Sequence, residues 1–294
     1  METWGISLII LVDLNQITFS NLFRMEKTKV PINDETIRYS ILRSLRGYSR
    51  KLFKEWGEVV ICCDSRKNWR KEVFPYYKAN RKKERANSKI DWEQAFASFE
   101  TVKGELKEFF PYTVVDVDNA EADDVIATLI KLNPDEKTLI LSGDTDFVQL
   151  HDKQRRIKQF SPVGKKFVFN ANPTIYLKQH IIEGDKSDGI PNIASPDDCL
   201  VLGKRQGTLG TSRIKYLTDT CPSQYPSVFK RNFERNKTLI DLQCIPPKIE
   251  TSIQEVWNAR PKKTKAKLFN YFFDKNLREF IDTVQDFWNS HLSK

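Results

Sequence analysis

The sequence has no apolar run long enough to cross a bilayer, and its cysteines do not form the motifs of zinc sites. The longest apolar run, ISLIILV at 6–12, has no basic segment before it, which argues against both a membrane helix and a signal peptide. The five cysteines form no CxxC pair and have no histidine partners at zinc spacing, so we expect reduced thiols. These absences predict a soluble, cytoplasmic protein that does not contact a membrane.

Histidines are few, and neither repeats nor an excess of negative charge are present. His151, His180 and His291 lie near no serine or cysteine in a recognisable nucleophile motif, so no catalytic role is predicted for them. Neither an internal repeat nor a low-complexity tract is present, which excludes a solenoid. The chain instead carries 48 Lys and Arg against 39 Asp and Glu, a formal net charge of +9. This balance favours an anionic partner such as nucleic acid.

Short apolar runs rich in β-branched residues are typical of buried strands. They are SLIILV (7–12), VVICC (59–63), TVVDV (113–117) and TLILS (138–142). Helical patterns at 35–55, 91–110 and 121–130 lie between them. This order predicts an α/β fold with a central, mostly parallel sheet flanked by helices. The segment 155–169 is expected to form a β-hairpin that turns at 161–164.

The pattern changes along the chain, which predicts two domains. Residues 1–190 are expected to form the α/β domain, and residues 191–294 a smaller domain that is mainly helical. Within the second domain, RPKKTKAK at 260–267 forms a basic patch.

Eight carboxylates stand at predicted strand ends or in the loops just beyond them, where ligands of parallel sheets bind. They are Asp13, Asp64, Glu121, Asp123, Asp144, Asp146, Asp185 and Asp188. Two unit charges about 4 Å apart repel by about 4 kcal/mol at an effective dielectric of about 20, so a cation is needed. Hard oxygen ligands favour Mg²⁺ or Mn²⁺. Eight acids suffice for two ions, which suit phosphodiester hydrolysis.

Not every acid in these segments is expected to bind metal. Taken alone, Asp13 is equally well explained as a cap of the following turn. Asp124 lies in the acidic first turn of a predicted helix, where carboxylates favour the positive end of the helix dipole. We therefore predict that Asp124 is a helix-end residue and not a ligand.

A basic and aromatic segment follows the second predicted strand. Residues 66–85 contain nine Lys or Arg and two Glu, interleaved with Trp69, Phe74, Tyr76 and Tyr77. A charge run is usually a solvated surface loop. Cations beside rings on which unpaired bases can stack are, however, what single-stranded nucleic acid requires. Because the segment directly follows Asp64, we favour nucleic-acid binding.

Five motifs together resemble the flap-endonuclease family of structure-specific 5′-nucleases. They are DLNQ (13–16), CDSRKNWRKEVFPYYKANRKKER (63–85), EADD (121–124), SGDTDFVQLH (142–151) and EGDKSDGI (183–190). The resemblance covers roughly residues 6–190. It implies a core similar to that of PIN-type nucleases, with a helical arch at about 66–90 and a C-terminal domain that binds duplex DNA and partners.

The resemblance also implies roles for individual residues. Asp13, Asp64, Asp123 and Asp144 would surround a first metal ion, with Glu121 close by. A second ion would lie near Asp146, Asp185 and Asp188. Lys78 and Arg81 would touch the scissile phosphate, so the implied catalytic residues are Lys78, Arg81, Asp123 and Asp144. The implied nucleic-acid contacts are Arg70, Lys71, Tyr77, Lys78, Arg81, Lys82 and Lys83.

The function that the resemblance implies is that of a 5′ to 3′ exonuclease and flap endonuclease with two Mg²⁺ ions, for which Mn²⁺ can substitute. Its substrates would be DNA and RNA–DNA hybrids with a 5′ single-stranded end or flap, and it would remove RNA primers and adjacent DNA during lagging-strand replication. A single-strand-binding protein and a sliding clamp are expected partners of a monomeric enzyme. One departure is that GDKSDGIPNIASPDDCLVLGKRQG (184–207) lacks the glycine pattern of the family's duplex-binding helical hairpin.

Three other classes of protein share some of these features. A PIN-type endoribonuclease shares the acidic core, but the long basic and aromatic segment disfavours it. A phosphatase of the haloacid-dehalogenase type needs a second Asp two residues after Asp13, where Asn15 stands. A DNA-branch binder without activity predicts gaps in the acidic set, and none is visible.

Overall fold

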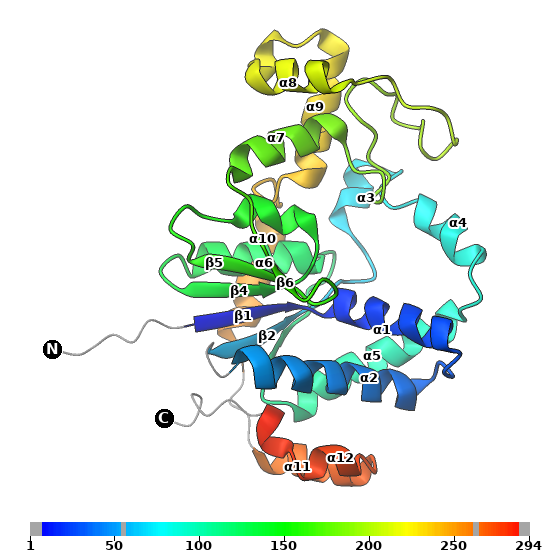
Figure 1. Cartoon of the computed structure of the whole chain (residues 1–294), viewed down its shortest axis with the longest axis vertical. Coiled ribbons are helices and arrows are strands. Elements are labelled where there is room, and N and C mark those ends of the chain that lie inside the picture. The colour runs from blue at the N-terminus through cyan, green and yellow to red at the C-terminus, as the bar shows by residue number, and fades with distance from the viewer. Residues whose placement is uncertain (1–7, 54–56, 261–264, 288–294) are drawn as a thin grey trace, which may run out of the picture.

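The computed structural model describes residues 8–53, 57–260 and 265–287, and a six-stranded sheet forms its centre (Figure 1). The strand order is β3-β2-β1-β4-β5-β6. All neighbouring pairs are parallel except β5 and β6. The strands are β1 (Leu8–Asp13), β2 (Glu58–Cys62), β3 (Thr113–Val115), β4 (Lys137–Leu141), β5 (Ile157–Ser161) and β6 (Lys166–Val168).

The central strand β1 is apolar on both sides because helices cover both faces of the sheet. Ile10 and Val12 belong to one core cluster, whereas Ile9 and Leu11 belong to another. Successive side chains of a strand point to opposite faces, so an unbroken apolar run is what a doubly covered strand requires. The predicted α/β fold with a mostly parallel sheet is confirmed.

The first face is covered by helices from both ends of the chain. They are α1 (Leu14–Thr28), α2 (Asp34–Tyr48), α5 (Trp92–Phe109), α11 (Lys265–Asp274) and α12 (Arg278–Ile281). Short turns of helix at Ser49–Phe53 and Val284–Phe287 accompany them. Phe272, Phe280 and Phe287 pack against one another and reach the same core as β1.

The second face is covered by α6 (Ala122–Leu132) and α10 (Pro247–Asn258). Ile253 of α10 is fully buried among residues of α6 and the sheet. Parts of the predicted C-terminal domain therefore belong to the layers around the sheet. Of the basic patch predicted at 260–267, residues 261–264 lie outside the described residues.

A third core lies beyond the ends of the strands. It joins α7 (Pro173–Glu183), α8 (Thr211–Asp219) and α9 (Ser227–Ile240) to Phe74 and Tyr77. The segment of Phe74 and Tyr77 contains two short helices, α3 (Trp69–Val73) and α4 (Asn80–Ala86), which lie to one side of the sheet in Figure 1. Residues 184–210 form loops and turns, so no helical hairpin follows α7 there.

Two elements differ from the sequence-based expectation. The predicted hairpin is present as β5 and β6, but β5 also extends the sheet in parallel to β4. Helix α1 was not predicted, because its buried side includes Thr18 and Asn21, which weaken the apolar pattern. The Asn21 side chain donates hydrogen bonds to Ser40 O and Ser44 Oγ, and so satisfies its polar group within the core. In the described segments, no helix is long and apolar enough to span a membrane.

Candidate active site

The predicted acids gather where the order of the sheet reverses. The chain leaves β1 towards β2 on one side, whereas β4 pairs with β1 on the other side. Asp13 is the last residue of β1, Asp64 follows β2, and Asp144 follows β4. Such a switch point is the usual ligand site of an open parallel sheet.

Asp13 has both of the roles considered from the sequence. One carboxylate oxygen accepts a hydrogen bond from Gln16 N at 3.0 Å and caps α1. The other oxygen accepts from Ser142 Oγ at 2.9 Å, beyond the end of β4. The cap fixes the orientation of a carboxylate that also faces Asp64 and Asp144.

Asp64 is held by two other elements. Its Oδ2 accepts from Asn15 Nδ2 at 2.5 Å, and its Oδ1 accepts from Ala122 N at 2.7 Å, at the start of α6. Asn15 therefore orients an acid of the cluster and cannot be the general acid that a dehalogenase-type phosphatase needs at this place.

The first turn of α6 separates structural from functional acids. Asp124 is fully buried and accepts hydrogen bonds from Glu121 N at 2.9 Å and from Trp69 Nε1 at 3.1 Å. Arg70 pairs with the same carboxylate at 2.8 Å. Asp124 is thus a capping residue with a full set of partners, as expected of a helix-end residue.

Burial and the mutual repulsion of charged carboxylates raise the pKa values of several other acids of the cluster. Burial and then the charge of Asp64 raise the pKa of Asp13 to about 7. Burial and then Asp146 raise the pKa of Asp144 to about 6. Burial and neighbouring carboxylates also raise the pKa of Asp64 and of Asp123. Such a cluster of oxygen donors with unfavourable negative charge fits divalent cations.

The loop after α7 brings the remaining acids to the cluster. Asp188 is buried, and its backbone N–H donates to Asp185 Oδ1 at 3.2 Å. Asp188 and Asp146 both repel Asp144. All eight predicted ligands therefore meet at one end of the sheet, although they come from five separate segments.

Lys78 and Arg81 of the basic segment pair directly with two of the acids. Lys78 Nζ lies 2.5 Å from Glu121 Oε1 and 3.5 Å from Asp188 Oδ2. Arg81 Nη2 lies 2.7 Å from Asp188 Oδ1. Burial disfavours the charge of Lys78, but Glu121 and Asp188 outweigh it and raise the Lys78 pKa. Lys78 is therefore a cation at neutral pH. Burial likewise opposes the charge of Glu121, yet Lys78 and Arg70 lower the Glu121 pKa to about 2.

The burial of Arg70 disfavours the phosphate contact expected from the resemblance. Only 2% of Arg70 is exposed, and its guanidinium binds Asp124, Glu121 and Leu239 O. These partners occupy the guanidinium within the protein. Arg70 instead ties α6 to the C-terminal end of α9.

Tyr77 also differs from its expected role as a nucleic-acid contact. It is 2% exposed, and its hydroxyl lies 2.8 Å from Glu121 Oε2 and 2.9 Å from Asp188 Oδ2. A buried ring in the third core offers no face to a base. Tyr77 therefore positions two acids of the cluster.

A glycine allows the basic segment to approach the acids. Gly189 has φ +74°, and a Cβ atom there would lie 2.8 Å from Tyr76 O. Beside it, Lys78 N donates to Asp188 O at 2.6 Å, and Lys78 itself has φ 55°. Positive φ values of non-glycine residues are uncommon and are retained where the surroundings impose them. The backbone contact thus fixes the position of Lys78.

The three other predicted lysines of this segment are exposed, whereas Arg81 is paired with Asp188. Lys71, Lys82 and Lys83 are exposed, and Arg81 is half-buried. Lys71 lies on α3, and Arg81, Lys82 and Lys83 lie on α4.

His180, for which the sequence predicts no catalytic role, also lies beside the acids. It lies on α7, and its Nε2 is 3.1 Å from Asp146 Oδ1. The sequence offered no signal, because 34 residues separate the two positions in the chain.

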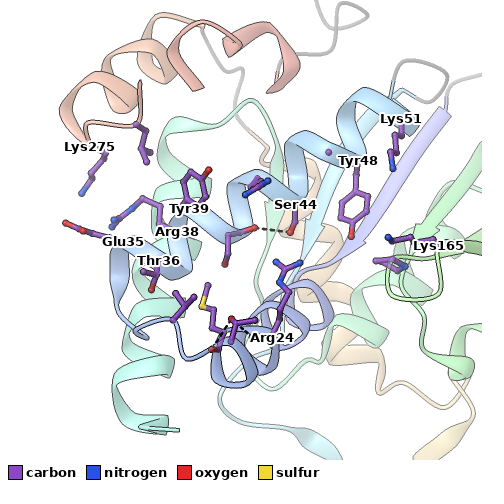
Figure 2. Close-up of a pocket in the computed structure, with 18 of the residues that line it drawn as sticks. Arg24, Glu35, Thr36, Arg38, Tyr39, Ser44, Tyr48, Lys51, Lys165 and Lys275 are labelled. Atoms are coloured by element: carbon purple, nitrogen blue, oxygen red, sulfur yellow. Dashed lines mark hydrogen bonds between the residues drawn. The ribbon is translucent and has the colours of Figure 1, made fainter. Parts of the chain in front are cut away.

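A separate groove of about 1190 Å³ lies on the first helical face, between α1, α2, the β5–β6 turn and the segment after α11 (Figure 2). Tyr48 and Phe160 contribute apolar surface to it. Cationic side chains predominate around it, and they include Arg24, Arg43, Lys51, Lys165 and Lys275. The groove shares no lining residue with the acidic cluster and favours an anionic ligand.

Sequence comparison assigns this site to a family. The 5′–3′ exonuclease N-terminal resolvase-like domain matches residues 8–181, and the C-terminal domain of T4 RNase H matches residues 171–287. The ribonuclease H of Enterobacteria phage T4 is 33% identical over 293 residues, which are 95% of each chain. The chain belongs to the 5′–3′ exonuclease family. It is a metal-dependent 5′-nuclease that hydrolyses phosphodiester bonds, with the exonuclease and flap-endonuclease activity of this family.

Other proteins resemble this chain more distantly. A thermostable DNA polymerase I of Thermus caldophilus is 23% identical over 279 residues, which are 89% of this chain and 31% of the polymerase. The flap endonuclease of bacteriophage T5, in a structure with DNA and metal ions, has a TM-score of 0.61 at 16% identity and covers 85% of this chain and 98% of its own. A structure of T5 5′-exonuclease with zinc ions has a TM-score of 0.58 at 17% identity, covering 86% and 98% of the two chains. These structures share the fold of this 5′-nuclease.

Proposed function

We propose that this 5′-nuclease uses two Mg²⁺ ions to remove RNA primers and adjacent DNA from 5′ ends during lagging-strand replication. The observation that carries the proposal is the meeting of eight carboxylates with Lys78 and Arg81 at one end of the sheet. The T5 relatives hold metal ions, and one of them also holds DNA.

The donor set supports Mg²⁺ at the first site. Asp13, Asp64, Asp123 and Asp144 would hold the first ion, and all offer oxygen donors, which Mg²⁺ prefers and Mn²⁺ accepts. Asp146, Asp185 and Asp188 would hold the second. When bound, such a pair supplies Lewis acidity for an in-line attack of water on the phosphodiester.

Lys78 and Arg81 would hold the scissile phosphate against the acids. Both are cations, and both are already beside the cluster through Glu121 and Asp188. A phosphate group that enters the site would replace part of this pairing and would meet fixed positive charge where negative charge develops. Asp64 would stay oriented throughout by Asn15 and Ala122 N.

The substrate would be a DNA or RNA–DNA hybrid with a free 5′ end or flap. The exposed cations Lys71, Lys82 and Lys83 suit the backbone of its single strand.

The proposed substrate is tested by incubating the protein with 5′-labelled and 3′-labelled flap, nicked and RNA-primed duplexes, in Mg²⁺ or in EDTA. Short 5′-labelled products from the RNA-primed duplex are expected, whereas cleavage only of unpaired internal RNA would favour a PIN-type endoribonuclease.

The groove between α1 and α2 would bind a partner protein. The α1–α2 groove, with its cationic rim, would accept an acidic segment of a replication protein such as a single-strand-binding protein or a sliding clamp. A double Arg43→Glu and Lys51→Glu variant should then lose binding to such a partner and keep its nuclease activity on naked DNA. The enzyme would act as a monomer in the cytoplasm.

A further inference from the structure

A histidine completes a compact cluster of potential metal ligands at the second site. His180 Nε2 lies 3.1 Å from Asp146 Oδ1 and 3.7 Å from Asp185 Oδ2. One ligand atom from each of these three residues lies within 4.8 Å of the others. The atoms thus converge on one point from α7, from the turn after β4 and from the loop after α7.

The contact between His180 and Asp146 is not a satisfied hydrogen bond. His180 Nε2 and Asp146 Oδ1 are both buried atoms without a hydrogen-bond partner in the described part of the chain. Buried polar atoms are rarely left in this state, and an ion is one of the usual reasons.

The three side chains are held in position from outside the cluster. The His180 ring stacks on Tyr176, with centroids 5.9 Å apart and planes at 9°. Asp185 Oδ1 accepts from Ser187 N and Ser187 Oγ, both at 2.7 Å, which leaves Oδ2 towards His180. Outer contacts of this kind orient the ligands of metal sites.

We propose that His180 is a nitrogen ligand of the second metal ion, together with Asp146 and Asp185. This inference rests on the proposed two-metal site. It adds which metal ions the second site prefers. A neutral imidazole offers one nitrogen lone pair, which suits first-row transition ions better than Mg²⁺. The second site therefore binds ions such as Mn²⁺, Co²⁺ or Zn²⁺ in preference to Mg²⁺, whereas the first site has oxygen ligands only.

The nitrogen can be detected directly with Mn²⁺ as the probe. Pulsed electron paramagnetic resonance of the full chain, stripped of metal and loaded with Mn²⁺, should show ¹⁴N coupling from imidazole. The sequence contains three histidines, so variants can isolate each one. The coupling should persist in a His151→Gln, His291→Gln double variant, in which His180 is the remaining histidine, and should vanish in His180→Gln.

Binding gives a second readout. His180→Gln should weaken one of the two Mn²⁺ sites by about 10-fold or more, and Mg²⁺ binding much less, since an oxygen replaces a nitrogen. The matched control is His151→Gln, because His151 Nε2 pairs with Gln159 Oε1 at 3.0 Å instead of with the cluster. It should keep both Mn²⁺ affinities.

Three results would overturn the inference. They are the absence of ¹⁴N coupling in the wild-type protein with two Mn²⁺ bound, its loss in the double variant, and its persistence in His180→Gln. Loss of the coupling in the double variant, or its persistence in His180→Gln, would show that the nitrogen ligand comes from another residue. Absence of the coupling in the wild-type protein would leave His180 as a cationic neighbour of Asp146 and Asp185. Flap cleavage in Mg²⁺ by the same wild-type sample separates this from the proposed function. Cleavage without nitrogen coupling rejects only the ligand, and coupling without cleavage rejects only the nuclease role.

Discussion

The ammonium nitrogen of Lys78 lies 2.5 Å from Oε1 of Glu121, and this contact joins the basic segment to the acidic cluster. Glu121 in turn contacts Arg70 and the Tyr77 hydroxyl. One carboxylate therefore collects contacts from three residues of the basic segment. This arrangement means that the cations nearest the chemistry are positioned by the acids themselves.

Removing the Lys78 charge should slow cleavage far more than it weakens DNA binding. We expect Lys78→Ala to lower the rate constant by about 100-fold or more, as for other preorganised transition-state contacts. Single-turnover cleavage and equilibrium binding in Ca²⁺ would measure the two effects. Lys82→Ala is the matched control, because Lys82 is exposed on α4 and should affect mainly salt-dependent binding. Equal losses in both variants would reduce Lys78 to a phosphate-positioning contact.

Arg70 should matter for stability and not for phosphate contact. Arg70→Ala leaves the buried Asp124 without its cation, and we expect it to lower the free energy of unfolding by about 3–5 kcal/mol. Denaturant titration measures this loss. Lys71→Ala, at the exposed neighbouring position, should change stability by about 0.5 kcal/mol or less. If Arg70→Ala were as stable as the wild type and bound DNA more weakly, the original expectation for Arg70 would be restored.

Gly189 should be needed for the position of Lys78. Gly189→Ala combines a positive φ with a Cβ atom 2.8 Å from Tyr76 O, so the backbone around Lys78 has to move. We expect slower cleavage with DNA affinity nearly unchanged. Gly203→Ala is a control with a similar positive φ but no atom within 4 Å of the added Cβ. Unaltered kinetics of Gly189→Ala would show that this close approach is not required.

The stability of the metal-free protein should depend on pH through Asp13. Burial and Asp64 raise its pKa from 3.8 to about 7, so between these values the folded state holds a proton that the unfolded state has lost. The stabilising contribution is complete below about pH 4 and disappears as the pH rises through about 7. The Mg²⁺-induced rise in melting temperature should therefore be larger at pH 8 than at pH 6.

Melting curves in EDTA and in Mg²⁺ at several pH values would test this dependence. The Asp13→Asn variant should have a weaker dependence on pH in EDTA, because its side chain does not titrate. A Mg²⁺ effect that is larger at pH 6 than at pH 8 would contradict the prediction.

The acids could be predicted from the sequence, but the fate of individual cations could not. Asp13 and Asp64 end apolar runs, and parallel strands bring such ends together whatever the rest of the chain does. Arg70 and Lys71 are neighbours in one charge run, yet Arg70 is buried and Lys71 is exposed. That difference depends on Asp124, which lies 54 residues away in the chain. The position of His180 beside Asp146 could not be predicted for the same reason, since only the fold brings the two together.

The central claim, that these carboxylates hold the metal ions of a 5′-nuclease, is tested most directly by Asp144→Asn on a 5′-labelled flap duplex. Asp118→Asn is the matched control, because Asp118 is an exposed carboxylate shortly before α6. The wild type and Asp118→Asn should release short 5′ products in Mg²⁺ and no products in EDTA. Asp144→Asn should bind the duplex but release no products in Mg²⁺. Undiminished turnover by Asp144→Asn, or wild-type cleavage that continues in EDTA, would contradict the assignment.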